Sequence, residues 1–511
     1  MRGAEYADVL FVLQVFGNKA DAVPCECLRK SYVWMNVYQL INNSAKRYPD
    51  HMAIMEGDVS VSYDSLMTII DAIAKDLHEF GIAGGHRVGL CFPNSIAYIA
   101  ITYALWKLDA AVVPIDTALK ESEVAQICDS MRITSIICFS NTAGSIRRQC
   151  PEIHTLFYFR KIQHSPQSIS SNKHIAFVRF TSGTTGKCKG VVLTHGKIIQ
   201  RIGSTNKVLH INAKDTVIWL LSMAHHFVST IVLYLSKGAA IILANGFWAG
   251  SILKKANQMK ATLIYASPFH YTMLANDQSG LMLPDIRLAI STTINLPDTV
   301  YEKFFKRYAI PIVQAYGIIE IGLICINTKN HEKKIGSVGS VLPDYKIKIN
   351  TVEEPLSQDR QCGELFFSGP GFFDAYFDPW IDAGTLLNDG WFETGDIGWI
   401  DDDGYVYICG RKNDVINTAG MKVFPQEIEN QLNRHPKIAE CCVYGKKHDR
   451  LGEVIAVDVV LEKAGKPLTE TEIQAYCRQK MASYKVPETI QIVGQIKKTL
   501  VTSKIIRRKP H

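Results

Sequence analysis

The chain has 511 residues, of which 47% are hydrophobic and 21% charged, and its formal net charge is +7. This length exceeds that of one ordinary domain, and the composition excludes a disordered, collagen-like or coiled-coil chain. The charge is mild and its cations are not interleaved with aromatic residues, so we expect no nucleic-acid partner.

Residues 1–37 are expected to form an extension of unassigned role. Its apolar stretch Val9–Phe16 resembles part of a secretory signal, but the cation Arg2 is offset by Glu5 and Asp8. An extension is therefore favoured over export, and a start codon further along the chain is the remaining alternative. We expect no transmembrane segment, because apolar runs approaching the roughly 18–20 residues that span a bilayer are absent. The 13 cysteines show neither metal-binding nor disulfide spacing, which is typical of reduced thiols in the cytoplasm.

From Tyr38 onwards, apolar residues alternate between helical and strand spacing. Helices are predicted over residues 39–48, 64–80 and 96–108, and buried strands over residues 87–92, 111–115, 217–221, 240–243, 262–265, 288–291 and 312–315. This alternation predicts an α/β fold with doubly wound sheets in a large N-terminal domain, residues 38–411.

After Gly336, short strands are separated by Gly, Pro and Asp turns, which predicts a small β-barrel-like subdomain over about residues 335–408. Its acidic run Asp401–Asp403 is expected at a solvated hairpin tip. Residues 412–511 are expected to form a small α+β domain with a basic end.

The strongest local signal is a loop rich in Gly, Ser and Thr between two apolar runs. Residues 180–190 read Phe-Thr-Ser-Gly-Thr-Thr-Gly-Lys-Cys-Lys-Gly, and Thr194 can cap the helix that follows. Glycines permit tight curvature, while hydroxyls, amides and lysines can hold phosphate oxygens. It is not a Walker A loop, because Thr181 and Cys188 occupy positions that need Gly and Ser or Thr. A flexible linker is the alternative, which the flanking strands disfavour.

Four further motifs follow in order: Gln314–Glu320, Trp391–Asp396, Gly410–Pro425 and Thr499–Arg508. With this loop, the chain resembles the adenylate-forming superfamily of acyl-CoA synthetases, peptide-synthetase adenylation domains and beetle luciferases, and is most similar to the acyl-CoA synthetases. The resemblance covers roughly residues 38–508 and implies that residues 412–511 form a mobile lid.

The resemblance also implies an ATP site. Tyr316, next to Gly317, is expected to stack on adenine, and Asp396 and Arg411 are expected to bind the ribose. Glu320 and a loop threonine would ligate Mg²⁺, a hard cation that prefers oxygen ligands. The loop residues implied to hold the phosphates are Thr181, Ser182, Gly183, Thr184 (also the metal ligand), Thr185, Gly186 and Lys187.

Residues of the lid are implied to serve both half-reactions. Lys504 is expected to bridge the acid carboxylate and the α-phosphate, where a cation offsets charge as pyrophosphate leaves. Asn413 is the implied hinge. Gly420 is expected to approach the pantetheine channel, and Lys422 is expected to meet the phosphates of CoA.

The segment Leu221–Phe227 resembles the family segment that ends in a gating histidine, so His225 is the expected gate. Shared metal ligation with His226 is disfavoured, because neighbouring side chains point in different directions. The residues directly after His225 include no aspartate that could pair with an α-ammonium group. This predicts an acid without an α-amine, either fatty or aromatic. The residues expected to line its pocket are Phe227, Ala266, Thr292, Thr293 and Ala315.

Five sites depart from the family pattern: Ile319 replaces Thr, Ser503 replaces Gly, Ser291–Thr293 replaces a Ser-Gly-Gly-like strand end, Cys188 replaces a common Pro, and Asn413 replaces the usual charged hinge residue. Losing one hydrogen bond to a charged group costs about 1.5–3 kcal/mol. Such a loss would slow catalysis by about tenfold to a few hundredfold without abolishing it.

The sequence therefore predicts an AMP-forming acid–thiol ligase in the cytoplasm. It would convert a carboxylic acid and ATP into acyl-AMP and pyrophosphate, and then transfer the acyl group to the thiol of CoA. Two alternatives stay open: an acyl-AMP ligase that loads the phosphopantetheine of a separate acyl or peptidyl carrier protein, and a nucleotide-binding paralogue with little turnover.

Overall fold

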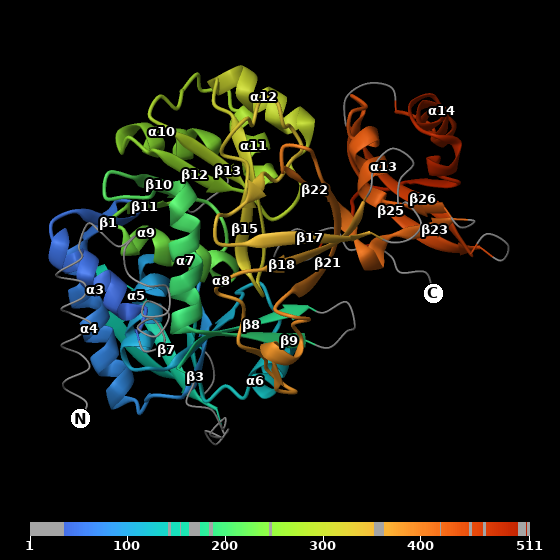
Figure 1. Cartoon of the computed structure of the whole chain (residues 1–511). Helices are drawn as coiled ribbons and strands as arrows, with labels where there is room; N and C mark the ends of the chain where they lie inside the picture. Colours follow the sequence, from blue (N-terminus) through green and yellow to red (C-terminus); the bar gives the residue numbers. More distant parts are fainter. Residues whose placement is uncertain are drawn as a thin grey trace.

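A computed structural model describes residues 35–141, 145–153, 155–162, 174–182, 188–244, 248–351, 362–418, 421–448, 452–462, 467–498 and 507. The predictions made for Gly183–Lys187, Gly420, Lys504 and residues 1–34 lie outside these residues. Figure 1 shows a large body followed by a smaller one at the C-terminal end of the chain, coloured orange to red.

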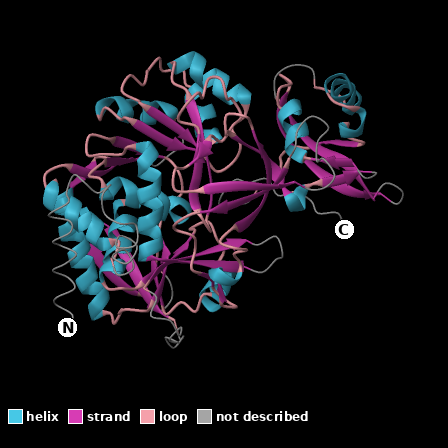
Figure 2. Ribbon diagram, in the orientation of Figure 1, coloured by secondary structure: helices cyan, strands magenta, loops and turns pink. Residues whose placement is uncertain are grey.

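Two nine-stranded sheets form the large body (Figure 2). The first, in sheet order, consists of β20 (Ile381–Asp382), β19 (Ala375–Tyr376), β9 (Cys188–Thr194), β8 (Ile175–Ser182), β4 (Ala111–Ile115), β3 (Arg87–Cys91), β5 (Ser135–Cys138), β7 (Thr155–Lys161) and β6 (Ile146–Cys150). The second consists of β16 (Ser340–Val341), β15 (Gly322–Ile326), β14 (Ile312–Ile318), β13 (Leu288–Ser291), β12 (Leu263–Ala266), β10 (Thr216–Trp219), β11 (Ala240–Leu243), β1 (Met52–Glu56) and β2 (Val59–Ser62). The central strands of both sheets pair in parallel, as the alternation of strands and helices predicted.

Helices cover these sheets in layers. They are α3 (Tyr38–Arg47), α4 (Tyr63–Glu79), α5 (Ile96–Lys107), α6 (Glu121–Ser130), α7 (His195–Leu209), α8 (Met223–His226), α9 (Ile231–Ser236), α10 (Ala249–Gln258), α11 (Pro268–Ala275) and α12 (Asp298–Tyr308). Helix α5 is apolar on all sides and almost wholly buried, which suits its place in the core that joins both sheets. Helices α10 to α12 pack a second core against the outer face of the second sheet.

Helix α7 begins where the sequence predicted, because Thr194 is its N-cap and accepts a hydrogen bond from the amide of Lys197. The helix contacts β9 of the first sheet and β15 of the second. It therefore links the sheet that leads into the phosphate loop to the one that carries Glu320.

The predicted β subdomain is a four-stranded antiparallel sheet of β17 (Lys346–Thr351), β18 (Gly363–Ser368), β21 (Phe392–Ile400) and β22 (Val406–Arg411). Asp401–Asp403 lies in the turn between its last two strands, where Lys334 forms ion pairs with the first and last of these acids.

The smaller body has its own apolar core. It contains β23 (Ile416–Thr418), β24 (Met421–Val423), β25 (Ile438–His448), β26 (Gly452–Leu461), β27 (Thr489–Ile492), α13 (Pro425–Leu432) and α14 (Glu470–Lys480). A separate apolar cluster of Cys362, Ile397 and Phe424 joins it to the four-stranded sheet.

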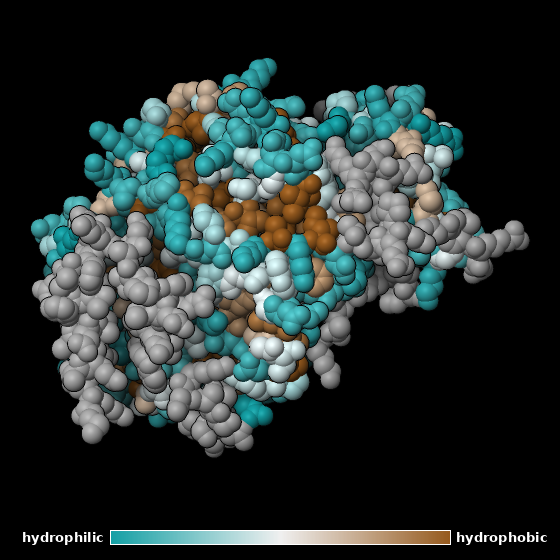
Figure 3. All heavy atoms as spheres, in the orientation of Figure 1, coloured by the Kyte–Doolittle hydropathy of each residue, from teal (hydrophilic) through white to brown (hydrophobic). Residues whose placement is uncertain are grey.

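The face of the molecule in Figure 3 is mostly hydrophilic; apolar residues gather close to the junction of the two bodies and in smaller groups elsewhere on the large body. Within the described parts of the chain, no helix combines the length and apolar character needed to cross a membrane.

Candidate functional site

The predicted site residues gather at the carboxyl ends of parallel strands, where open α/β sheets bind their ligands. Strands β4 and β8 run parallel, so Asp116 after β4 and the carboxyl end of β8 lie at the same edge. In the second sheet, β12, β13 and β14 are neighbours and Ala266, Ser291 and Gln314 are in register, so Thr292 and Ala315 follow directly after this row.

Tyr316, Asp396 and Arg411 form one hydrogen-bonded cluster. The Tyr316 hydroxyl donates to Oδ2 of Asp396 at 2.5 Å, and Arg411 Nε lies 2.6 Å from Oδ1 of the same carboxylate. Asp396 is only 4% exposed. Burial and the Asp396 charge raise the pKa of Tyr316 well above its usual value, so the phenol stays protonated and donates. The three residues predicted to bind the adenosine of ATP are thus brought together.

Gly317 has a backbone role in this cluster. A Cβ atom there would lie 2.2 Å from the carbonyl oxygen of Gly322, and the strand pairing shifts register between Tyr316 and Gly317. Only glycine permits this close approach of β14 to β15. The presence of a glycine is therefore explained without any contact to a cofactor.

Glu320 lies in the turn between β14 and β15, and this turn is held by a buried cation. Arg201 of α7 donates to the carbonyl oxygens of Ile319 at 2.8 Å, Glu320 at 2.7 Å and Gly371 at 2.5 Å. The amide of Phe373 also donates to the Glu320 carbonyl at 2.7 Å. Burial lowers the pKa of Arg201 to about 10, which still leaves it charged at neutral pH.

The side chain of Glu320 fits a metal ligand. Its Oε1 accepts a hydrogen bond from the Tyr376 hydroxyl at 3.1 Å, whereas Oε2 has no hydrogen-bond partner among the described residues. Mg²⁺ takes one or two carboxylate oxygens and completes its coordination with phosphates and water. A half-buried carboxylate with one oxygen held and one available suits that role. Thr184, the other predicted ligand, lies outside the described residues.

At Ile319, the carbonyl group is held by Arg201 and the side chain packs against the core. The hydroxyl that relatives carry here is replaced by apolar packing. The position of the Glu320 turn is thus maintained by backbone contacts that do not need a threonine.

His225 lies in α8 between two charged groups. Arg179 donates to its carbonyl oxygen at 2.6 Å and contacts its Nδ1 at 2.7 Å, and Nε2 lies 3.7 Å from Oδ2 of Asp116. Burial alone would raise the pKa of Asp116, but hydrogen bonds from His225 and the Ala118 amide outweigh it and lower the pKa.

The residues predicted to line the acid pocket differ in their surroundings. Phe227 is 1% exposed and packs into the core against Tyr98, Tyr103 and Trp106. Ala266, the last residue of β12, and Ala315, directly before Tyr316 in β14, are both buried.

A stacked aromatic pair lies at the ends of β10 and β12. The rings of Trp219 and Tyr265 are parallel with centroids 5.6 Å apart, and His226 meets both rings edge-on. Nearby, Thr293 has a φ of 82°, which is a strained conformation for a β-branched residue. A threonine here thus adopts backbone angles that favour glycine.

Asn413 lies exposed in a short helical turn, Lys412–Asp414, that joins the two bodies. Lys412 beside it forms ion pairs with Glu364 at 2.7 Å and Glu393 at 3.1 Å. Lys422 lies on β24 and pairs with Asn417 on the antiparallel strand β23. The hinge role of Asn413 stays a prediction.

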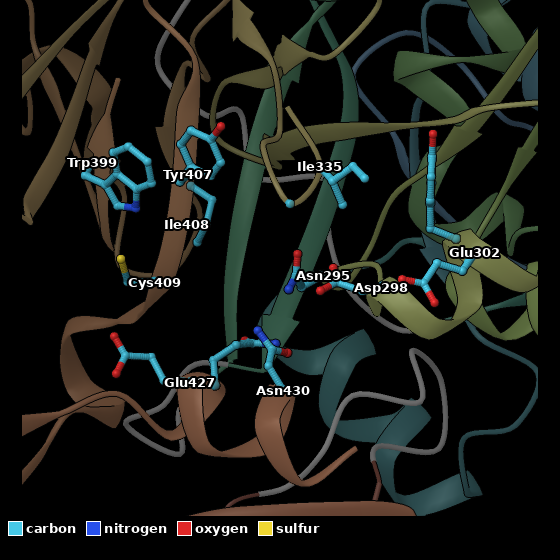
Figure 4. Close-up of a pocket in the computed structure, with 13 residues that line it drawn as sticks. Asn295, Asp298, Glu302, Ile335, Trp399, Tyr407, Ile408, Cys409, Glu427 and Asn430 are labelled. Atoms are coloured by element: carbon cyan, nitrogen blue, oxygen red, sulfur yellow. The ribbon is translucent and has the colours of Figure 1, made fainter. Parts of the chain in front are cut away.

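A cavity of about 520 Å³ separates the large body from α13 (Figure 4). Trp399, Tyr407 and Cys409 line one side, Asp298 lies on another, and Glu427 closes it from α13. Of the predicted site residues that the structure describes, none lines this cavity. Arg434 spans the same junction with an ion pair to Asp298 at 2.5 Å.

Sequence reasoning missed four residues that contact predicted site residues: Asp116, Arg179, Arg201 and Tyr376. A signal existed for Arg179, because it is the one charged residue in the apolar run 175–180. Arg201 is similarly the one lysine or arginine among the buried residues of α7. Asp116 and Tyr376 carry no such signal, since only the sheet order brings them to the site.

Comparisons with known proteins identify the family to which the chain belongs. The family model of AMP-binding enzymes matches residues 41–377, and that of the AMP-binding enzyme C-terminal domain matches residues 427–501. A 2-succinylbenzoate–CoA ligase of Bacillus cereus (strain AH820) is 28% identical over 477 residues, which cover 90% of this chain and 95% of that protein. A feruloyl-CoA synthase of an Amycolatopsis species is 25% identical over 472 residues, covering 89% and 94%.

Among solved structures, the o-succinylbenzoate coenzyme A synthetase of Bacillus subtilis in complex with AMP has the same fold. Its TM-score is 0.78 at 23% identity, with 92% of this chain and 97% of that chain covered. The first family model spans more than half of the chain and begins and ends within the large body. The protein therefore belongs to the family of AMP-binding enzymes, as its ordered motifs predicted.

Proposed function

We propose that the protein is an acid–CoA ligase that works in two half-reactions. In the first, an acid carboxylate oxygen attacks the α-phosphorus of ATP, the bond to the bridging oxygen of pyrophosphate breaks, and acyl-AMP forms. In the second, the thiolate of CoA attacks the acyl carbon and AMP leaves with its phosphate oxygen. The names of the relatives, which are CoA ligases and synthetases, support CoA as the acceptor.

The observation that carries the proposal is the cluster of Tyr316, Asp396 and Arg411. It offers an aromatic face for adenine and a buried carboxylate that can accept hydrogen bonds from ribose hydroxyls. Arg411 and Tyr316 hold this carboxylate in place before any nucleotide binds, which reduces the cost of ordering the site. Mg²⁺, when bound at Glu320, would offset the charge of the phosphates.

We infer that the acid is a compact aromatic one without an α-amine. The Trp219–Tyr265 stack and the bulky strand end at Thr292 and Thr293 favour a planar substrate over a long flexible chain. The first relatives are named for succinylbenzoate and for feruloyl-CoA, which favours the same class. Asp116 is a carboxylate near the predicted gate that could in principle pair with an α-ammonium group. Its oxygens already face the Ala118 amide and His225, so it does not alter the inference that the acid has no α-amine.

Pyrophosphate release tests the proposal. The full chain is incubated with ATP and Mg²⁺ and with a panel of benzoates, cinnamates, fatty acids and amino acids, each with and without CoA. We expect acid-dependent pyrophosphate release with aromatic acids and acyl-CoA only when CoA is present. If acyl-AMP forms but is transferred only to a phosphopantetheinylated carrier protein, the acceptor is a carrier. If ATP binds and no acid elicits pyrophosphate, the protein is not a ligase.

A further inference from the structure

A single half-buried arginine holds both the main chain and the ring of the predicted gate residue. Arg179 lies in β8, two residues before the start of the phosphate loop. Its Nη1 donates to the carbonyl oxygen of His225 at 2.6 Å, and its Nη2 contacts Nδ1 of the same residue at 2.7 Å. The strand that leads into the phosphate loop is thus bonded directly to α8.

This contact determines which nitrogen of the His225 ring carries the proton. A guanidinium has five N–H donors and no acceptor, so Nδ1 must accept the hydrogen bond from Arg179. The proton of the neutral ring is then on Nε2, which faces Oδ2 of Asp116 at 3.7 Å. A proton on Nδ1 would face the Nη2–H donor of Arg179 and break the contact.

The charges around the pair maintain this arrangement at neutral pH. Burial lowers the pKa of Arg179 to about 10, and the negative charge of Glu320 counters that shift, so the guanidinium stays charged. Asp116 is ionised, because hydrogen bonds outweigh the effect of its burial on its pKa. The ring of His225 therefore lies between a cation on its Nδ1 side and a carboxylate on its Nε2 side.

We propose that Arg179 is a positioning residue that sets the tautomer and orientation of His225 and so holds the gate segment α8 against the strand leading into the phosphate loop. The proposal rests on the proposed function in one respect, namely that His225 gates the approach of the thiol. Arg179 then acts on the second half-reaction through His225. Direct action on the acid or the phosphates would affect the first half-reaction instead.

A double-mutant cycle separates these two possibilities. Arg179→Gln, His225→Ala and the double variant are compared with the native chain by ATP–pyrophosphate exchange and by single-turnover transfer from preformed acyl-AMP to CoA. Loss of a hydrogen bond to a charged group slows a step by about tenfold or more, and we expect that loss in the transfer step of Arg179→Gln. In the His225→Ala background the same change should alter transfer by less than about twofold, because contacting residues that act as a unit are not additive.

Two further variants control for folding. Arg87 is a buried arginine in the same sheet whose described contacts are with the Met131 carbonyl and the Phe377 ring and not with His225, so Arg87→Gln should leave the ratio of the two steps unchanged. Arg179→Lys keeps the cation but cannot reach both acceptors of His225 with a fork of donors. If Arg179→Gln does not fold, Arg179→Lys replaces it in the cycle. We then expect a smaller loss of rate in the transfer step. The proposal would be overturned if the rate effects of Arg179→Gln and His225→Ala simply multiply in the double variant. It would also be overturned if Arg179→Gln slows only ATP–pyrophosphate exchange and not transfer to CoA.

The tautomer can be measured without any substrate, which separates failure of this inference from failure of the proposed function. In ¹⁵N-histidine-labelled protein, with the signal assigned by its loss in His225→Ala, we expect a protonated Nε2 and an unprotonated Nδ1 at pH 7. Arg179→Gln should shift the signal toward a mixture of tautomers. A native ring protonated on Nδ1 contradicts the inference even if the enzyme is fully active.

Discussion

Asp396 and Arg411 are register partners across the ladder of β21 and β22, and their side chains meet at 2.6 Å. Arg411 is also the last residue of β22, directly before the turn that joins the two bodies. The carboxylate predicted to bind ribose is therefore tied to the segment about which the smaller body would turn. Nucleotide binding and the position of this segment are expected to be coupled.

Tyr316→Phe tests the other contact of this carboxylate. It removes the hydroxyl that donates to Asp396 and keeps the aromatic face. We expect the KM for ATP to rise about tenfold with a smaller change in kcat, since a hydrogen bond to a charged group contributes about 1.5–3 kcal/mol. Steady-state kinetics provide the measurement. Tyr345→Phe is the matched control, because the Tyr345 hydroxyl is buried with no hydrogen-bond partner among the described residues.

Tyr376→Phe probes the contact to the predicted metal ligand. The hydroxyl of Tyr376 donates to Oε1 of Glu320, and partners of metal ligands typically account for about 10–100-fold in metal affinity. We expect half-maximal adenylation to need about tenfold more Mg²⁺, with little change in thermal stability. Tyr407→Phe, which removes a phenol near the surface acid Asp401, should leave the Mg²⁺ titration unchanged. Superimposable titrations for Tyr376→Phe would show that this contact does not tune the metal.

Thr293→Gly should stabilise the protein despite the flexibility of glycine. A φ of 82° costs a β-branched residue about 1–3 kcal/mol, and glycine loses only about 0.5–1 kcal/mol through its unfolded-state entropy. We expect a gain of about 1 kcal/mol in the urea-unfolding free energy. Thr292→Gly is the control, since its φ is negative, and it should destabilise the protein. A loss of stability in Thr293→Gly would show that side-chain contacts of Thr293 outweigh the backbone strain.

Lys504→Ala tests the role implied for the lid. The variant should lose most acid-dependent pyrophosphate exchange while still converting preformed acyl-AMP and CoA to acyl-CoA. The reason is that the cation offsets charge only where carboxylate attacks phosphorus. Lys498→Ala, which removes an ion pair with Glu440 in the same body, is the control and should retain both steps. Equal loss of both steps in Lys504→Ala would contradict a lid that serves them in different positions.

The buried His195 predicts the direction of acid destabilisation. Burial lowers its pKa to about 3, and Nδ1 accepts a hydrogen bond from the Val37 amide. Because the unfolded state binds its proton near pH 6.5 and the folded state does not, the contribution is present above pH 6.5 and is lost as the pH falls toward 3. Between pH 7 and pH 5 the loss is about 2 kcal/mol from this residue.

Urea unfolding of the native chain and of His195→Asn at both pH values measures this contribution. The variant keeps an acceptor near Val37 but cannot titrate, so its stability should fall less on acidification. His270, whose pKa burial lowers to about 4, remains as a second source of the same trend. Parallel pH dependence in the two proteins would show that His195 is not responsible.

Local sequence was sufficient to predict the elements. Apolar spacing predicted a helix over residues 96–108 and a strand over 111–115, and the structure has α5 at Ile96–Lys107 and β4 at Ala111–Ile115. Thr194 was identified as a cap because capping depends on neighbours within one turn. The ordered motifs likewise identified the family, since each motif is contiguous in the chain.

The contacts that surround those motifs could not be predicted in the same way. Arg201 holds the Glu320 turn from a position 119 residues away in the chain, and Arg179 reaches His225 across 46 residues. Such pairs depend on sheet order and on the path of α7 between the sheets, which no local spacing encodes. The sequence by itself determined which chemistry the chain carries, because motifs are short-range. Only the tertiary structure decided which buried cations hold that chemistry in place, because long-range packing brings them there.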